Sequence, residues 1–294
     1  MEKFPSTRVI SICSSGHLDV WRLTSRLLQK FVQADEFFVY VPDDEINDFL
    51  AVTPPAIKIM PESDLGQEFS SRLQGEMLLA DNVDRFGWYF QQFLKIEALI
   101  RSTTERVVIW DADCVPLKNI RLFDENDNAV YMKASEHHQE YFRMIQNLLG
   151  LTRIQDQSFV IPGFPMKKDW VNGFVQDVES RNDNDKWFDA IISCTDLSQQ
   201  SGFSEFETLG TWVANSYPHS WISSNLTWER LGQSRFGPAQ NFTPEALVKL
   251  GQANGLDVIS FENWDKRSTR KWLRNGLLWL LRPMRSRKNA SSAL

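Results

Sequence analysis

The hydrophobic and polar positions of the first sixty residues alternate in a pattern typical of an α/β protein. Short apolar runs predict strands over 8–13, 37–41 and 57–60, and apolar residues at helical spacing predict helices over 17–33 and 44–50 between them. Strands that alternate with helices in this way predict a Rossmann-like half with parallel strands. The same reading predicts further helices over 68–81, 87–100, 136–149, 170–178, 187–194 and 243–254, another helix after Ser204, and strands over 129–134, 158–161 and 256–260.

The stretch 106–119 combines a buried strand with two acids. Residues 107–110 (VVIW) form a continuous run of β-formers, which is typical of a strand buried on both faces, and Asp111 and Asp113 follow it directly. Ligands of open α/β sheets bind outside the carboxyl ends of the strands. Two carboxylates this close repel each other, and a divalent cation such as Mg²⁺ or Mn²⁺ would neutralise them. A solvated turn is the alternative interpretation.

The helix expected over 87–100 has two distinct faces. Its non-core face carries Trp88, Gln91, Gln92 and Lys95, and no acid. Amides can read a base or sugar hydroxyls, and lysine is a point-charge partner for phosphate. A solvated helix face is the alternative.

The turn after the first strand reads Ser14-Ser15-Gly16. It lacks the G-x-G-x-x-G pattern, which disfavours dinucleotide binding. Ser14 is therefore either close to a bound nucleotide or part of an ordinary turn.

Three segments together carry a resemblance to a known family. They are WDADCVPLKN at 110–119, GWYFQQFLKIEAL at 87–99 and SEFETLGTWV at 204–213. The first resembles the D-x-D element of GT-A glycosyltransferases, and the combination resembles a bacterial group of transferases linked to capsule and lipopolysaccharide assembly, over residues 8–221. The resemblance implies a GT-A Rossmann-like α/β fold with a mostly parallel mixed sheet flanked by helices. It also implies a nucleotide-sugar donor, Mn²⁺ or Mg²⁺, and a polysaccharide or glycolipid acceptor.

The resemblance also implies roles for single residues. Asp113 would bind the metal directly, while Asp111 would bind it directly or through water, or contact the ribose of the donor. The 87–100 helix would border the donor site, and His219 would join the metal shell unless it is structural. An acceptor hydroxyl must lose its proton during attack, and an acid at a helix start supplies the base in several such families. Glu205 is the first candidate.

Glu207 is the second candidate base. It has a competing structural role, because Ser204 followed three residues later by Glu207 fits a capping box.

Composition and charge limit the remaining possibilities. The 294 residues are 42% hydrophobic, which is enough for a sizeable core. The three cysteines are scattered and show no C-x-x-C spacing, and the N-terminus lacks an apolar signal region. We therefore expect a reduced cytoplasmic protein. Residues 265–294 hold nine Lys or Arg and one acid, so the other residues carry a net charge of −14. An acidic body argues against nucleic-acid binding.

The basic tail suggests a membrane surface. As a helix, residues 266–294 would gather Trp272, Trp279 and leucines on one side and Arg or Lys on the other, which is the pattern of an interfacial anchor. We therefore expect a transferase domain over 1–264 and a basic amphipathic tail over 265–294. The tail would hold the protein peripherally on anionic lipid at the inner face of the cell membrane. Packing on the body or on a second subunit is the alternative.

The leading hypothesis is thus a metal-dependent glycosyltransferase. A nucleotidyltransferase also joins a Rossmann-like half to metal-binding acids, but the 14–17 turn lacks the cation that such enzymes usually carry. A third hypothesis is an inactive, membrane-associated scaffold with the same fold.

Overall fold

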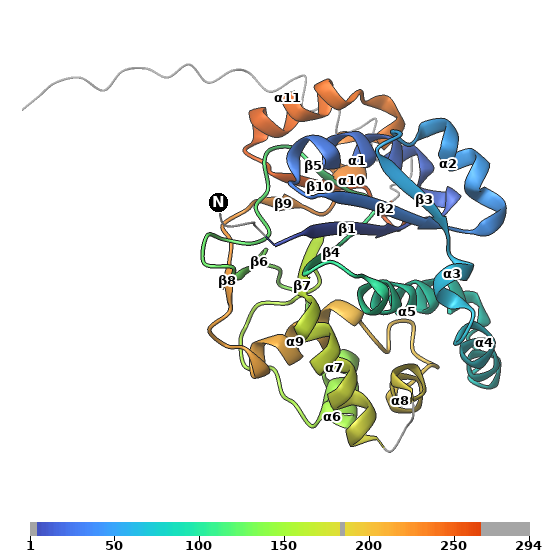
Figure 1. Cartoon of the computed structure of the whole chain (residues 1–294). Coiled ribbons are helices and arrows are strands. Elements are labelled where there is room, and N and C mark those ends of the chain that lie inside the picture. The colour runs from blue at the N-terminus through green and yellow to red at the C-terminus, as the bar shows by residue number, and fades with distance from the viewer. Residues whose placement is uncertain (1–4, 183–185, 266–294) are drawn as a thin grey trace, which may run out of the picture.

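A five-stranded, mostly parallel sheet forms the centre of the computed structural model, which describes residues 5–182 and 186–265 (Figure 1). The strand order is β3-β2-β1-β4-β7, and only β7 runs antiparallel to its neighbour. The strands are β1 (Thr7–Ile12), β2 (Glu36–Val41), β3 (Ile57–Pro61), β4 (Arg106–Trp110) and β7 (Gly163–Lys167). The expected α/β class with a mostly parallel mixed sheet is confirmed, whereas the expected amphipathic tail lies outside the described residues.

Helices cover both faces of this sheet (Figure 1). On one face, Trp21 of α1 and Phe49 of α2 pack in the same cluster as Val39 and Val41 of β2. On the other face α5 contacts β1 and β4, and α7 and α9 pack behind it. The helices are α1 (Leu18–Phe31), α2 (Ile46–Val52), α3 (Ser63–Gly66), α4 (Ser70–Leu79), α5 (Phe86–Arg101), α6 (Gln139–Leu149), α7 (Lys168–Arg181), α8 (Trp187–Cys194), α9 (Glu205–Ser216), α10 (Gly232–Phe236) and α11 (Pro244–Asn254), with short 3₁₀ turns η1 (Ser15–His17), η2 (Asp43–Glu45), η3 (Val83–Arg85) and η4 (Ala239–Asn241). Within the described ranges, no helix is both long and apolar enough to cross a membrane.

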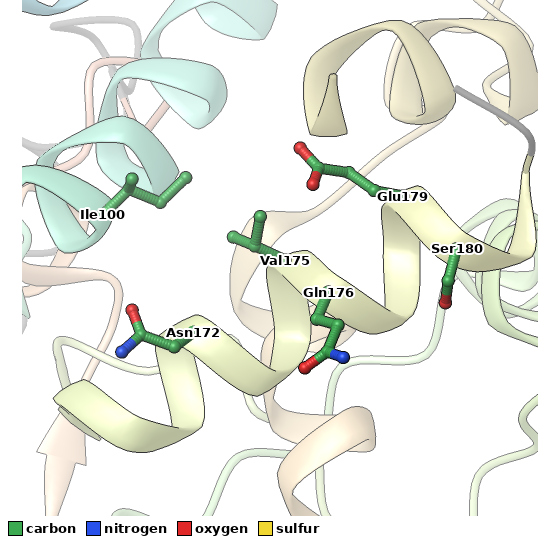
Figure 2. Close-up of a pocket in the computed structure, with 6 residues that line it drawn as sticks. All are labelled: Ile100, Asn172, Val175, Gln176, Glu179 and Ser180. Atoms are coloured by element: carbon green, nitrogen blue, oxygen red, sulfur yellow. The ribbon is translucent and has the colours of Figure 1, made fainter. Parts of the chain in front are cut away.

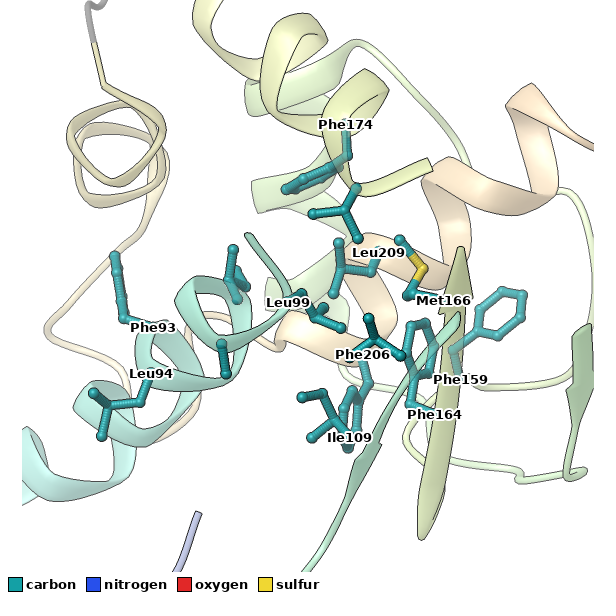
Figure 3. Close-up of a cluster of buried hydrophobic side chains, with 14 of the residues drawn as sticks. Phe93, Leu94, Leu99, Ile109, Phe159, Phe164, Met166, Phe174, Phe206 and Leu209 are labelled. Atoms are coloured by element: carbon teal, nitrogen blue, oxygen red, sulfur yellow. The ribbon is translucent and has the colours of Figure 1, made fainter. Parts of the chain in front are cut away.

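The largest core cluster fills the space between β4, β7 and the helices on that face (Figure 3). Each of its aromatic and aliphatic side chains contributes about 1.5–3 kcal/mol on burial. This packing surrounds α5, so that even Gln92 and Lys95 are only 5% exposed. The alternative of a solvated face on this helix is therefore wrong. Labelled members of the cluster are Phe93, Leu94, Leu99, Ile109, Phe159, Phe164, Met166, Phe174, Phe206 and Leu209.

The strand expected over 158–161 is wrong, because the chain forms its strand at β7 instead. There Gly163 pairs with Trp110, and a Cβ at Gly163 would lie 2.5 Å from the indole ring. Pro165 is tolerated in β7 because this strand lies at the edge of the sheet. The proline and glycine, which suggest a loop in the sequence, thus fit an edge strand that lies under a large indole.

Two small sheets flank the central one. One has the order β5 (Cys114–Pro116), β10 (Val258–Ser260) and β9 (Trp228–Glu229), and the other pairs β6 (Ala129–Tyr131) with β8 (Trp221–Ser223). β10 runs antiparallel to β5, which directly follows the two acids of the D-x-D element. The late part of the chain is thereby brought against the turn that carries Asp111 and Asp113.

Candidate functional site

The two acids lie at the point where the strand order reverses. From β1 the chain moves outward through β2 and β3, then returns to the other side of β1 as β4. A ligand in such a sheet binds outside the carboxyl ends of the two strands at the reversal. The turn after β4 carries Asp111 and Asp113. Burial first, and then the charge of Asp113, raise the pKa of Cys13 at the end of β1, so both strand ends face the same place.

Three backbone hydrogen bonds hold the acidic turn, one within the turn and two to other segments. The amide of Asp111 donates to the carbonyl of Pro162 at 2.9 Å, and the amide of Cys114 donates back to the carbonyl of Asp111 at 3.0 Å. From the other side, the amide of Phe261 donates to the carbonyl of Asp113 at 2.9 Å. One ligand atom each from Asp111, Asp113 and Cys114 lies within 4.8 Å of the others, so the turn is a candidate metal site.

Lys95 joins Asp111 to Glu205. Its Nζ lies 2.7 Å from Oδ1 of Asp111 and 2.8 Å from Oε1 of Glu205, and 4.4 Å from the ring centroid of Phe206. The side chains of Lys95 and Glu205 are 7% and 2% exposed, and that of Asp111 is 24% exposed. Burial lowers the pKa of Lys95, but attraction to the two carboxylates outweighs it and raises the pKa, so the lysine stays charged.

Asp113 has no such partner. Among the described residues no ion pair reaches its carboxylate, and its pKa is raised to about 6, first by burial and then by repulsion from Asp111. Burial raises the pKa of Glu262, and the nearby charge of Asp113 raises it further. Arg230 Nε lies 2.7 Å from Glu262 Oε1 and lowers the pKa of Glu262. The site therefore holds more acid than base, which favours a bound cation.

The donor atoms fit a hard cation better than zinc. Burial, followed by the charge of Asp113, raises the pKa of Cys114 well above its usual range, and its Sγ lies 2.9 Å from Ser260 Oγ. A neutral thiol is a poor ligand, because the thiolate is the form that binds metals. The carboxylates remain, and these suit Mg²⁺ or Mn²⁺.

The other residues expected at the donor site lie near it to different degrees. Nε2 of Gln91 donates to the carbonyl of Ile12 at 3.3 Å, so this face of α5 reaches the end of β1. Gln92 donates to the carbonyl of Trp88 within its own helix at 3.3 Å. Trp88 is half-buried under the guanidinium of Arg85, and Ser14 is exposed in the turn after β1.

The acids of α9 point to different neighbours. Glu205 reaches Lys95, as described above. The amide of Glu207 donates to Ser204 Oγ at 3.2 Å, which is the expected cap, and its Oε2 accepts from Ser158 Oγ at 2.7 Å and from the amide of Phe159 at 3.1 Å. The catalytic roles of both acids stay predictions.

His219 is exposed in the loop before β8, and it is not a member of the Asp111, Asp113 and Cys114 group. Glu262 is a residue of the site that the sequence does not predict. No motif marks it, and only the pairing of β10 with β5 brings its segment to the site.

A cavity of about 400 Å³ lies between α5 and α7, and neither Asp111 nor Asp113 is among its lining residues (Figure 2). Glu179, the one charged residue among the described lining residues, accepts a hydrogen bond from the amide of Trp187 at 3.1 Å. The described residues around this cavity include no paired acid and base that would suit catalysis. Its lining residues are Ile100, Asn172, Val175, Gln176, Glu179 and Ser180.

Residues 16–216 match a family model described as "Family of unknown function (DUF6492)". The chain belongs to this family. The matched range contains α5, β4 with its acidic turn, and all of α9, but not Ser260 or Glu262. Among solved structures, the chain is similar to the apo crystal structure of mouse xyloside xylosyltransferase 1, at 11% identity and a TM-score of 0.48, over 90% of this chain and 100% of that one. No curated protein matches the chain.

Proposed function

We propose that this protein is a metal-dependent glycosyltransferase that uses a nucleotide-sugar donor. The observation that carries the proposal is the unpaired Asp113 carboxylate beside the Asp111–Lys95–Glu205 contact at the switch point of the sheet. A partly buried acid that no cation pairs is costly, and a divalent ion bound to phosphates removes that cost. The resemblance of the three sequence segments to GT-A glycosyltransferases supports the same function.

In this proposal Asp113 is the principal metal ligand and Asp111 the second. Mn²⁺ or Mg²⁺, when bound, would supply charge stabilisation for the leaving nucleoside diphosphate. Lys95 acts as a positioning residue, because a 7% exposed ammonium held by two carboxylates orients Asp111 and has little surface left for a phosphate. Gln91 of α5, whose side-chain amide reaches the end of β1, is the amide best placed to contact the donor.

Glu205 was predicted as the base, but its contacts favour a different role. A carboxylate that is 2% exposed and bound to Lys95 has no direct access to an acceptor hydroxyl. We therefore propose that Glu205 positions Asp111 through Lys95. We further propose a saccharide or glycolipid acceptor at the cytoplasmic membrane face, which rests on the composition of residues 265–294 and on the sequence resemblance.

The test is hydrolysis of nucleotide-sugars without acceptor. The protein is incubated with a panel of UDP-, GDP-, dTDP- and CMP-sugars, with Mn²⁺ or with EDTA, and the nucleotide products are separated by chromatography. We expect Mn²⁺-dependent release of nucleoside diphosphate, or of monophosphate from a CMP-sugar. The Asp113→Asn variant should lose this activity, because one metal-binding oxygen becomes an amide.

The exposed Asp48 of α2 offers a matched control, since Asp48→Asn makes the same chemical change far from β4 in the sequence. Equal activity of wild type and Asp113→Asn would exclude the metal role. Release of pyrophosphate from a nucleoside triphosphate and a sugar phosphate would instead identify a nucleotidyltransferase.

A further inference from the structure

A second cavity, of about 570 Å³, lies in the loops beside α9. Two segments form it, 135–137 and 153–156, and an antiparallel bridge between Ala134 and Ser158 joins the loops that contain them. We call this cavity the loop pocket. It is lined by Ser135, His137, Arg153, Ile154, Gln155 and Asp156.

The guanidinium of Arg153 is fixed in the wall of the loop pocket and is only partly neutralised, because burial raises the pKa of the Glu207 carboxyl on α9 and the charge of Arg153 offsets part of that rise. Its Nη1 lies 3.0 Å from Nδ1 of His137, its Nη2 donates to the backbone carbonyl of Asp156, and its Cζ lies 5.2 Å from the ring centroid of Phe142. No ion pair among the described residues involves Arg153, and its buried Nε has no hydrogen-bond partner there. A fixed guanidinium of this kind suits the planar fork of a carboxylate or the oxygens of a phosphate.

The neighbouring groups add neutral donors. Because Arg153 donates to Nδ1 of His137, the neutral imidazole carries its proton on Nε2, where it is a donor. The hydroxyl of Ser135 and the amide of Gln155 line the same cavity. Among the described residues that line it, Asp156 is the only acid, and it contacts Arg153 through its backbone carbonyl rather than through its carboxylate. The loop pocket therefore offers one oriented cation and several donors to an oxygen-rich ligand.

The first turn of α9 connects the loop pocket to the acidic turn. Glu207 holds the pocket loop, because its Oε2 accepts hydrogen bonds from Ser158 Oγ and from the amide of Phe159. Two residues earlier in the same turn, Glu205 contacts Lys95 and through it Asp111. The first turn of α9 thus contacts both the loop next to the loop pocket and, through Lys95, the acidic turn, so it is a direct structural link between the pocket and the proposed donor site.

We propose that the loop pocket binds the anionic group, a carboxylate or a phosphate, of a saccharide acceptor. The identification of the ligand as an acceptor rests on the proposed glycosyltransferase function. The binding of an acidic sugar rests only on the pocket.

The experiment measures binding without chemistry. The full chain, in EDTA and without donor, is titrated with D-glucuronate, glucose 6-phosphate, glucose and inorganic phosphate, and each dissociation constant is obtained from saturation-transfer NMR or from the ligand-dependent rise in melting temperature. We expect glucuronate or glucose 6-phosphate, whichever anion fits, to bind at least about tenfold more tightly than glucose, because a charged hydrogen bond is gained. Arg153→Gln should remove this preference, and Arg153→Lys, which keeps the charge but not the fork, should retain part of it.

The matched control is Arg143→Gln. Arg143 pairs with Glu140 on α6 at 2.7 Å, and its side chain is 60% exposed, so the same change there should leave the preference intact. Melting temperatures without ligand show whether each variant is folded, and if Arg153→Gln is not, Arg153→Lys decides. Equal binding of glucose, or an unchanged preference in the folded Arg153 variants, would overturn the proposal. Tight binding of inorganic phosphate alone would overturn the saccharide part.

The outcome is separable from that of the proposed function. If acidic sugars bind here but no nucleotide-sugar is hydrolysed, the pocket stands and the transferase proposal fails. If hydrolysis occurs but acidic sugars do not bind, the transferase proposal stands and the pocket proposal fails.

Discussion

Replacing Lys95 by methionine tests the central contact of the site. The change keeps a long unbranched side chain and removes the charge that lies between Asp111 and Glu205. Breaking a buried ion pair by deleting one partner costs about 3–5 kcal/mol, because the remaining charges are left uncompensated. Since Asp111 is 24% exposed and can gain water, whereas Glu205 cannot, we expect the lower end, about 3 kcal/mol of unfolding free energy. That is a large part of the stability of an ordinary domain.

The loss should depend on pH with a defined sign. Burial already raises the pKa of Glu205, and without Lys95 it should rise further, above its value in the unfolded chain. A folded variant with a raised carboxyl pKa binds more protons than its unfolded form, so its stability falls as pH increases through that pKa. Lys95 itself stays charged in the wild type, since its pKa is raised. The deficit of Lys95→Met should therefore be larger at pH 8 than at pH 5.

The assay is urea unfolding followed by tryptophan fluorescence at both pH values, with equal m-values as the check that the folded state is intact. Adding Glu205→Gln to Lys95→Met should restore part of the loss, because the second change removes the orphaned charge. Lys58→Met is the control: Lys58 lies 3.3 Å from Glu36 but is 60% exposed, and an exposed pair contributes less than about 1 kcal/mol. A loss below about 1 kcal/mol that is equal at both pH values would refute the buried contact.

Two further predictions concern the metal and the packing of α9. Because the pKa of Asp113 is raised to about 6, the folded apo protein should lose stability as pH rises from 4 through 6. A metal binds the ionised carboxylate, so Mn²⁺ should raise the melting temperature more at pH 7.5 than at pH 5. An equal rise at both pH values would contradict this assignment. Gly210→Ala places a methyl group into the ring of Phe159 and should lower the free energy of unfolding by about 1–3 kcal/mol in the same urea assay. Gly75→Ala is the control, because a Cβ there meets nothing within 4 Å, and it should be neutral or stabilising. Equal effects would show that the contact between α9 and Phe159 is looser than described.

Local patterns of the chain predicted most of the fold and the two acids of the candidate metal site. A buried strand that ends in two acids can be recognised from neighbouring residues alone. The same is true of the two faces of α5, one of which carries Lys95. The cap made by Ser204 and Glu207 was equally local, and the structure has it. These features depend on residues within a few turns of each other.

The features that the sequence did not predict depend on contacts between distant segments. The β7 strand was expected five residues too early because Pro165 disfavours a central strand, and only the order of strands shows that this one is at the edge. Glu262 and Arg153 carry no motif of their own. The pairing of β10 with β5 brings Glu262 to its place, and the bridge between Ala134 and Ser158 does so for the loop of Arg153. Neither pairing can be predicted from spacing along the chain.

The pairing of β10 with β5 sets the order in which the site can be completed during synthesis. Residues up to α9 can build the central sheet and its helices, but the amide that holds the carbonyl of Asp113 belongs to Phe261 and leaves the ribosome long after β4 has been made. Until then the acidic turn lacks one of its three supports. A nascent chain can thus acquire its scaffold well before its capacity to bind a cation.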